Sequence, residues 1–339
     1  VFSLSCERHC VDCPKEPESP PAGNYRVYVY DAWNRFIMSL DTPSDTIVDS
    51  IRIGYYGYGI FLTPDNDRLL VTKYDGYTME IYRTRDLAYL GSTNQYGDYF
   101  FDGSDNYGIC ICYPTKQIYF IDPMSLNPFD SIGKVVYSGY LDTVCDRLYC
   151  TNFDTLYVID CRSQSLLATK LLYDPYFGPI TANNVAHNWV TGDIYFHGER
   201  SFYQYNIDSD SVLAKMSIVG PTGAVAISRD AKLVYMTDGG EGVHDLIPRG
   251  DIYIFSALSH ELTSIIPAFD YSSGIIGYPC FGQLIIAPDN RRAYLGSSSN
   301  SLGGVPMRVV DLYEGKIIST IKPYALFDAA AIVVGKIPK

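Results

Sequence analysis

Residues 59–72 read GIFLTPDNDRLLVT, an apolar segment, a Pro-Asp-Asn-Asp turn and a second apolar segment. The same unit returns as QLIIAPDNRRAYLG at residues 283–296 and as AVAISRDAKLVYMT at residues 224–237. Short apolar runs that meet at Pro, Asp and Asn favour paired β-strands joined by tight turns. The unit therefore predicts antiparallel hairpins repeated along the chain.

A third and a fourth strand follow each hairpin. TLYVID at residues 155–160 precedes SLLATKLL, and MRVVDL at residues 307–312 precedes KIISTI. The whole unit recurs about every 40–50 residues, which is the period of propeller blades. The sequence thus predicts an all-β, seven-bladed β-propeller over residues 25–339, preceded by an extended Cys/Pro-rich N-terminal arm over residues 1–24.

The two ends of the propeller sequence complement each other. Residues 25–31, 35–41 and 46–53 supply three strands without a fourth, and residues 329–336 (AAAIVVGK) supply a lone apolar strand. Together they make one four-stranded blade, which closes the ring because no end blade is left with an uncovered face. The other six blades are expected to begin near Gly59, Tyr99, Val135, Ala182, Gly223 and Gly282, and the fifth and sixth contain Gly-rich inserts.

The repeat resembles the YVTN-type seven-bladed β-propeller repeat family, whose units run through a Pro-Asp-Gly turn, a YVTN-like strand and a VIDT-like strand. The matching segments are APDNRRAYLG at residues 287–296, LYCTNFDTLYVID at residues 148–160 and DTIVDSIRIG at residues 45–54. The resemblance implies a secreted or surface-displayed propeller. It implies no activity, because scaffold residues define the family.

Composition narrows the function classes. The chain has 339 residues, a net charge of −12 and 31 tyrosines. Such an acidic surface repels nucleic-acid phosphates, and no apolar run reaches the roughly 20 residues of a membrane span.

Nine cysteines favour an oxidising compartment, so we expect an extracellular or cell-surface location. The first five residues, VFSLS, resemble the end of a secretory apolar segment, and Ser5-Cys6 fits a loose lipoprotein-cleavage pattern.

Aromatic residues are concentrated in the connections between blades. In a propeller these connections surround one mouth of the central channel, where stacking on a sugar or on a partner side chain is possible. The predicted binding residues are Tyr56, Tyr58, Tyr99, Tyr140, Tyr176, Tyr278, Phe281 and Tyr324. The alternative for any of these rings is packing between adjacent blades, since tyrosine also suits β-structure.

The cysteines suggest covalent assembly. Cys145 and Cys150 flank a tight turn and are predicted to form a disulfide, whereas Cys161 is expected to be a buried apolar residue. Cys6, Cys10 and Cys13 in the arm have a spacing that also occurs in iron–sulfur loops and, with His9, in zinc sites. Disulfides, within the arm or to another chain, fit a secreted protein better.

Catalytic motifs are weak. Asp65-Asn66-Asp67 and Asp208-Ser209-Asp210 alternate acidic oxygens as calcium loops do, but neither continues with the required Gly and distal Glu. His187, His197 and His244 are candidate ligands or bases without a recognisable carboxylate partner. Hydrolase and nucleotide-binding motifs are absent. We therefore expect no catalytic residue, metal or cofactor.

Three functions are compatible with these features. The first is a non-enzymatic interaction or assembly module that self-associates into a filament or coat through its arm. The second is a propeller that recognises a surface protein or glycan at an aromatic channel mouth. The third is a propeller enzyme or oxidoreductase subunit.

The arm generates the first testable prediction. The proline-rich spacer at residues 14–21 spans about 25 Å at roughly 3 Å per residue, enough to reach a neighbouring subunit. Deleting residues 1–24, or adding reductant, is expected to shift the full chain from an assembly to a monomer in sedimentation velocity. A monomer before and after the deletion, with all three arm thiols free, would contradict arm-mediated assembly.

Overall fold

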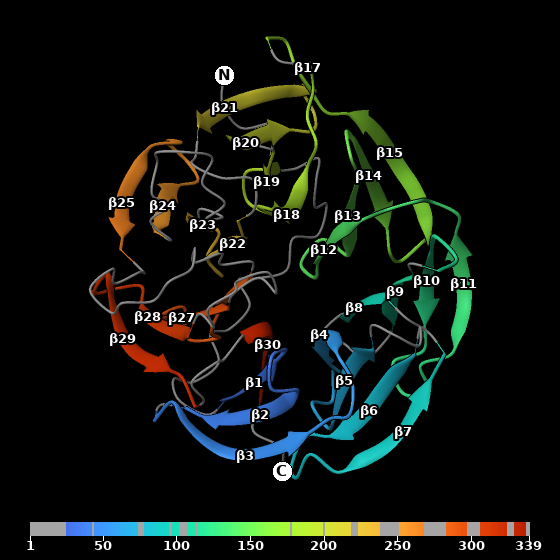
Figure 1. Cartoon of the computed structure of the whole chain (residues 1–339). Coiled ribbons are helices and arrows are strands. Elements are labelled where there is room, and N and C mark those ends of the chain that lie inside the picture. Colours follow the sequence, from blue (N-terminus) through green and yellow to red (C-terminus); the bar gives the residue numbers. More distant parts are fainter. Residues whose placement is uncertain are drawn as a thin grey trace.

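The computed structural model describes residues 25–42, 44–73, 78–94, 97–101, 107–112, 114–176, 178–198, 201–217, 223–237, 251–267, 283–296, 306–323 and 329–336. These residues form seven four-stranded antiparallel sheets arranged as a ring, a seven-bladed β-propeller (Figure 1). They contain no helix, and hence none long and apolar enough to cross a membrane. The all-β prediction is confirmed, while the arm at residues 1–24 lies outside the described residues.

We number the blades from the first complete one along the chain and give their strands from the centre outward. Blade 1 comprises β4 (Gly57–Leu62), β5 (Arg68–Lys73), β6 (Met79–Arg83) and β7 (Tyr89–Thr93). Blade 2 comprises β8 (Gly97–Phe101), β9 (Gly108–Cys112), β10 (Gln117–Ile121) and β11 (Pro128–Ile132). Blade 3 comprises β12 (Ser138–Asp142), β13 (Arg147–Asn152), β14 (Thr155–Asp160) and β15 (Ser165–Leu171).

Blade 4 comprises β18 (Asn183–His187), β19 (Asp193–His197), β20 (Ser201–Asn206) and β21 (Ser211–Ser217). Blade 5 comprises β22 (Val225–Ile227), β23 (Leu233–Thr237), β24 (Ile252–Ser256) and β25 (Leu262–Ile266). Blade 6 comprises β26 (Gln283–Ile286), β27 (Arg292–Gly296), β28 (Met307–Asp311) and β29 (Lys316–Ile321). The first strand of each of these six blades begins within three residues of the predicted position. The sequence period therefore located the blades correctly.

Blade 7 joins the two ends of the propeller. Its strands are β30 (Ala329–Lys336), β1 (Tyr25–Asp31), β2 (Phe36–Asp41) and β3 (Thr46–Arg52). β1 and β30 pair in antiparallel fashion over their whole lengths, with Val27 opposite Val334 and Val29 opposite Ile332. The predicted closure is thus confirmed, and the inner strand of blade 7 comes from the far end of the sequence.

Seven apolar clusters hold the ring together, one at each interface between blades. The middle strands are buried on both faces because each blade is covered by two neighbours. In β1, Val27 and Val29 pack with residues of blade 6, whereas Tyr28 and Tyr30 pack with residues of blade 1. Burial on both faces removes the polar alternation expected of a half-exposed strand, which explains the near-continuous apolar runs in the sequence.

Polar side chains reinforce every one of these interfaces. From the 7/1 interface round to 6/7, the contacts are Tyr28 to Thr84, Arg68 to Pro123, Tyr107 to Asp146, His187 to Asp142, Asn188 to Ala231, Arg229 to Asn290 and Arg292 to Asp45. Apart from the Arg292–Asp45 and His187–Asp142 pairs, these are hydrogen bonds without an ion pair. They fix the angular position of each blade, because hydrogen bonds depend on direction and apolar contacts do not.

The disulfide predicted between Cys145 and Cys150 does not form. Cys150 is a free, fully buried thiol in the cluster between blades 2 and 3. Cys145 lies in the β12–β13 turn, and β13 begins only at Arg147. Asp142 lies opposite Arg147 at the end of the β12–β13 pair, so β13 carries Cys150 away from the turn that contains Cys145. Cys161 is buried and free, as expected.

Ring closure makes β30 indispensable. Deleting residues 328–339 is expected to leave the protein aggregated or largely unfolded, because β1 loses one of its two partner strands and the clusters beside blade 7 are opened to water. Gel filtration and far-UV circular dichroism measure the outcome. Deletion of residues 337–339 alone, which retains β30, is the control. A soluble product of the larger deletion with an unchanged melting temperature would refute this role of β30.

Candidate functional site

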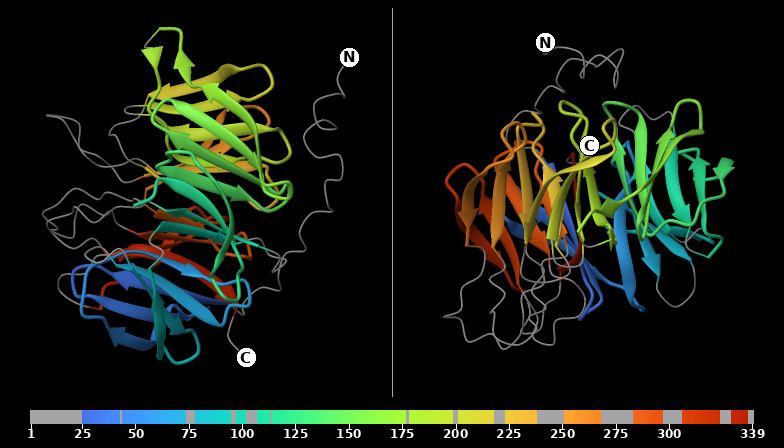
Figure 2. Two further views of the ribbon diagram at one scale, coloured as in Figure 1. Left: turned by 90° about the vertical axis from the view of Figure 1, so that its right-hand side faces the viewer. Right: turned by 90° about the horizontal axis from the view of Figure 1, so that it is seen from above.

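The ring has two different faces. One face, which we call the loop face, carries two kinds of connection. These are the connections from the outermost strand of each blade to the next blade and the connections between the second and third strands of each blade. The turn face carries the remaining connections, which are mostly tight turns. Figure 2 shows the ring edge-on, with the blades side by side and their strands running between the two faces.

The predicted binding tyrosines have different environments. Tyr56 and Tyr176 are exposed on the loop face, whereas Tyr140 is half-buried and Tyr99 is buried. The backbone of Tyr58 lies in β4, but its side chain is outside the described residues. The remaining predicted residues, Tyr278, Phe281, Tyr324, Cys6, Cys10 and Cys13, also lie outside the described residues, as do His244 and the Gly-rich inserts.

Tyr99 packs between blades instead of lining the channel mouth. Its ring centre lies 5.8 Å from that of Phe61 in blade 1 and 6.3 Å from that of Phe101 in its own strand. Burial, with smaller effects from the neighbouring Cys110, raises the pKa of its hydroxyl. The prediction of an exposed ring is therefore wrong for Tyr99, and the packing alternative applies.

An aromatic patch occupies the loop face between blades 3 and 4. We define the hairpin patch as Tyr137, Phe153, Leu171, Tyr173 and Tyr176. Tyr176 is 89 % exposed, and each of the other four side chains is more than half exposed. The rings of Tyr137 and Phe153 contact each other, with centres 4.8 Å apart. Exposed aromatic rings that lie against each other in this way are typical of surfaces that contact a partner.

Two of these residues belong to a hairpin that the propeller does not need. β16 (Tyr173–Asp174) and β17 (Gly178–Pro179) form a separate two-stranded sheet between blades 3 and 4, and it projects beyond the rim of the ring (Figure 1). The connection from blade 3 to blade 4 thus contains a structural element of its own, with exposed aromatic rings.

The hairpin is firmly anchored at its base. Leu172 and Ile180 are buried in the cluster between blades 3 and 4, and the Ile180 amide donates a hydrogen bond of 2.9 Å to the Leu172 carbonyl. Asp174 is buried and forms a 2.9 Å ion pair with Lys215 on β21. It also accepts a hydrogen bond of 2.8 Å from the Tyr176 amide. The exposed rings are therefore presented on an ordered support, which lowers the entropic cost of binding.

His187 belongs to a buried network at the interface of blades 3 and 4. Its Nδ1 lies 2.5 Å from Asp142 and its Nε2 lies 3.1 Å from the Tyr149 hydroxyl, and all three residues are buried. Asp142 also accepts hydrogen bonds from the amides of Val144 and Cys145 in the adjacent turn. The network ties two inner strands together, and no part of it is open to a substrate.

The same network contains a set of metal-ligating atoms. Asp142, Cys145 and His187 place one ligand atom each within 4.8 Å of one another. Cys145 is not among the free thiols, and His187 already contacts Asp142 and Tyr149 with its two ring nitrogens. The arrangement thus fits a structural link between blades better than a metal centre.

His197 has a different environment. It lies at the end of β19, is fully buried, and neither of its ring nitrogens has a hydrogen-bond partner among the described residues. The Gly223 backbone covers it so closely that an added Cβ there would lie 2.7 Å from the imidazole. Burial lowers the pKa of His197 from 6.5 to about 4, so the ring is neutral at physiological pH.

The acidic pairs considered as calcium ligands are parts of turns. The Asp65 carboxylate accepts hydrogen bonds from the Thr63 hydroxyl and the Asp67 amide. The Asp210 carboxylate accepts a hydrogen bond from the Tyr205 hydroxyl and forms an ion pair with Lys170. Both carboxylates thus stabilise the turns in which they lie, and Asp210 also links blade 4 to Lys170 of blade 3.

Sequence reasoning missed two exposed aromatic residues of the loop face. Trp33 and Phe153 are each at least half exposed and lie in connections between second and third strands. Both residues lie outside the connections between blades, from which the predicted binding residues are taken. A residue-by-residue reading of the short second-to-third turns would have identified both side chains.

No family model matches the chain, and no curated protein matches its sequence. The YVTN resemblance therefore remains a resemblance of repeats. Solved structures with the same architecture do exist. A functionally unknown protein from Desulfotomaculum acetoxidans DSM 771 is similar at a TM-score of 0.63 with 12 % identity, covering 91 % of this chain and 98 % of that one.

Two further structures share the fold. The dihydro-heme d1 dehydrogenase NirN in complex with DHE aligns at a TM-score of 0.60 with 11 % identity, covering 97 % of this chain and 78 % of that one. A chain of the mitotic checkpoint complex aligns at 0.63 with 13 % identity, covering 85 % and 86 %. At these identities the comparisons establish a β-propeller and no particular activity. Propellers serve generally as interaction modules, and one of these neighbours is an enzyme.

The buried His197 predicts a pH dependence of stability. Its pKa is about 4 in the folded protein and near 6.5 in the unfolded chain, so the unfolded state binds more protons between these values. Stability from this residue is complete above pH 6.5 and is lost as the pH falls towards 4. The loss amounts to about 3 kcal/mol, since one pKa unit corresponds to about 1.4 kcal/mol.

Urea unfolding at pH 7 and pH 4.5 tests this dependence. His197→Leu is expected to lose less stability than the wild type between the two values, by about 2–3 kcal/mol. His260→Asn, which removes an exposed histidine from a turn, should retain the wild-type dependence. Equal losses in the wild type and in His197→Leu would show that His197 does not cause the effect.

Proposed function

We propose that this protein is a non-enzymatic interaction module of the cell exterior, and that the hairpin patch binds a protein partner. The observation that carries the proposal is the projecting β16–β17 hairpin, which is anchored by buried residues yet exposes Tyr173 and Tyr176. Tyrosine and phenylalanine supply large contact areas at low entropic cost, and they are enriched in the centres of protein interfaces.

The composition of the patch favours a protein over a glycan at this position. Leu171 and Phe153 add apolar surface that has no polar group to bind a sugar hydroxyl. The extracellular location is supported by the nine cysteines and the acidic, tyrosine-rich composition. Arm-mediated self-assembly remains a separate prediction, because the arm at residues 1–24 lies outside the described residues.

An enzymatic function receives little support from the described histidines of blade 4. His187 contacts Asp142 and Tyr149 with its ring nitrogens, and His197 is buried without a hydrogen-bond partner. Neither imidazole is accessible to a substrate. The candidate bases in this part of the chain therefore serve the packing of the blade.

Site-specific photo-crosslinking tests the proposed interface. A benzoylphenylalanine at position 176, in the full chain displayed by its natural host, is expected to give a defined crosslinked species on SDS gels. The same residue at position 313 is the matched control, since Tyr313 is 90 % exposed but lies on the turn face. A species formed equally from both positions, or from neither, would contradict the proposal.

The hairpin variant completes the test. Replacing Tyr173 and Tyr176 by Ser is expected to abolish a crosslink formed from position 137 while leaving the melting temperature within about 1–2 °C, because exposed side chains contribute little to stability. If the partner is a second copy of the chain, the crosslinked species has twice the mass of the chain and grows with protein concentration.

A further inference from the structure

Cys145, in the β12–β13 turn on the turn face, is disulfide-bonded. The chain has nine cysteines, and the four others among the described residues are buried, free thiols: Cys110, Cys112, Cys150 and Cys161. The partner of Cys145 is therefore one of the four cysteines that lie outside the described residues, namely Cys6, Cys10, Cys13 and Cys280. Three of these four belong to the N-terminal arm.

The turn that contains Cys145 is held on several sides. Asp142, at the end of β12, is buried, and its carboxylate accepts hydrogen bonds of 2.8 Å from the Val144 amide and 3.1 Å from the Cys145 amide. Asp146 adopts a left-handed conformation with φ of 51°, and its carbonyl accepts a hydrogen bond of 2.9 Å from the Cys161 amide. Cys145 itself is only partly buried, so the ordered turn leaves it within reach of a segment that approaches the turn face.

Cys280 is too far from Cys145 for this bond. It precedes Gln283, the first residue of β26, by three residues, in a connection between blades that belongs to the loop face. Three residues of chain reach at most about 11 Å from Gln283. Cys145 lies on the opposite face, beyond the length of β12, which is about 14 Å. Blade 6 also lies across the ring from blade 3 (Figure 1). A chain of three residues cannot cover both separations, which leaves the arm cysteines.

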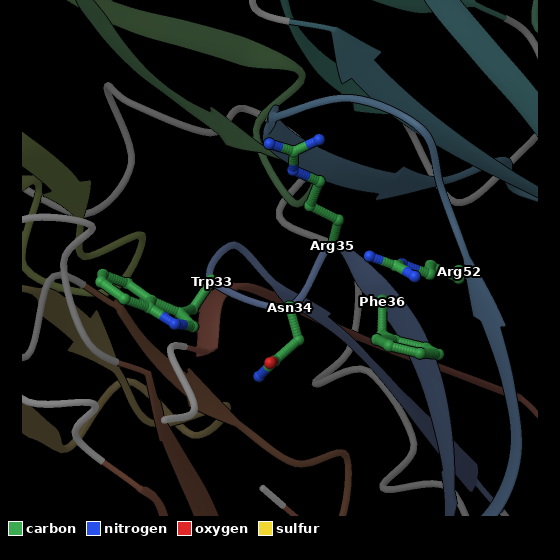
Figure 3. Close-up of a pocket in the computed structure, with 5 residues that line it drawn as sticks. All are labelled: Trp33, Asn34, Arg35, Phe36 and Arg52. Carbon is green, nitrogen blue, oxygen red and sulfur yellow. The ribbon is translucent and has the colours of Figure 1, made fainter. Parts of the chain in front are cut away.

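The arm joins the propeller on the same face as Cys145. β1 ends at the turn that Figure 3 shows, where Trp33 and Asn34 lie between β1 and β2. This turn connects the second and third strands of blade 7 and therefore belongs to the loop face. The other end of β1, at Tyr25, lies on the turn face, and residues 1–24 precede it directly.

The arm is also long enough to reach blade 3. Cys13 precedes Tyr25 by 12 residues, and an extended chain of that length spans up to about 40 Å. This is about twice the radius of gyration of roughly 20 Å that is usual for a compact domain of this size. Cys10 and Cys6 are further from Tyr25 along the chain and have a longer reach. Each arm cysteine can therefore cross the turn face from blade 7 to blade 3.

We propose that Cys145 forms an intrachain disulfide with one of the three arm cysteines, and that this bond fastens the arm across the turn face. Blade 7 and blade 3 lie across the ring from each other, so the arm passes the turn-face mouth of the central channel (Figure 1). The loop face stays open to partners. The inference does not depend on the hairpin patch, and the two remaining arm cysteines are left to bond with each other or with a neighbouring chain.

The bond forms by thiol–disulfide exchange with an oxidised dithiol carrier, the disulfide donor of an oxidising compartment. The arm thiolate first attacks the disulfide of the carrier and forms a mixed disulfide. The Cys145 thiolate then attacks the sulfur of the arm cysteine, and the bond to the carrier breaks as the new S–S bond forms. The carrier leaves as a dithiol, with the two electrons and the two protons that the thiols of the chain have lost.

Mass spectrometry of a tryptic digest tests the bond. The full native chain is alkylated to block free thiols and is then digested without reductant. Cleavage at Lys and Arg places the candidate cysteines in separate peptides: Cys6 in residues 1–8, Cys10 and Cys13 in 9–15, Cys145 in 135–147, Cys150 and Cys161 in 148–162, and Cys280 in 250–291. We expect residues 135–147 joined to residues 1–8 or 9–15, in protein taken from the band of single-chain mass on a non-reducing gel. Reductant should separate the two peptides.

Variants assign the bond to Cys145. Cys145→Ser should abolish the joined peptide and open the partner cysteine in the arm to alkylation. Cys150→Ala is the matched control, because it removes a free thiol from the same hairpin and should retain the joined peptide. In a third form of the chain, a protease site is inserted within residues 16–23. Cleavage there should leave the arm attached to the propeller without reductant and release it with reductant.

Three outcomes would overturn the proposal. Residues 135–147 recovered from the native protein with an alkylated Cys145 would show that the thiol is free. Linkage of this peptide to residues 148–162 or 250–291 would assign the bond to a cysteine outside the arm. A joined peptide found only in a band of twice the chain mass would mean that the disulfide connects two chains, so that the arm is not fastened to its own propeller.

Discussion

A tyrosine side chain that reaches from one blade to the next is the interaction on which much of the ring depends. Tyr28 and Tyr30 extend from blade 7 towards blade 1, where they contact Thr84 and Gly57. Tyr25 reaches Asp289 in blade 6, and Tyr107 reaches Asp146 in blade 3. The aromatic ring of each tyrosine fills the space between two twisted sheets. Its hydroxyl forms a hydrogen bond with a polar group at the edge of the neighbouring blade.

This use of tyrosine accounts for both the composition and the chemistry of the interior. The apolar part of the side chain is buried, and burial raises the pKa of the Tyr28 hydroxyl to about 12, so it stays protonated and able to donate. Phenylalanine would fill the same space but would leave the edge groups of the next blade without a partner. The polar links therefore add angular precision to an interface whose stability comes mainly from apolar burial.

The sequence predicted the fold well because the scaffold signal is repeated. Each Pro-Asp or Arg-Asp turn marks a hairpin, and the unmatched strands at residues 25–53 and 329–336 required a shared blade. The site was harder to predict, since tyrosines in similar connections are exposed in one blade and buried in another. Tyr56 is exposed while Tyr99 is buried, because Tyr99 lies within β8 and faces blade 1. Strand register and side-chain direction decide such cases, and neither is visible in residue type alone. The missing Cys145–Cys150 disulfide has another cause, since the spacing of two cysteines around a turn does not show where β13 begins.

The pairing of β1 with β30 also determines how the ring responds to force. Tyr25 lies opposite Lys336, so the segments before β1 and after β30 leave the blade at the same end. Tension between these two segments breaks the hydrogen bonds of the pair one after another, as in a zipper, instead of loading all of them together in shear. Under this tension the β1–β30 pair therefore opens at a lower force than it would in shear. A load applied between the loop face and only one of these segments does not pull β1 and β30 away from each other. It therefore does not break the hydrogen bonds of the pair one after another.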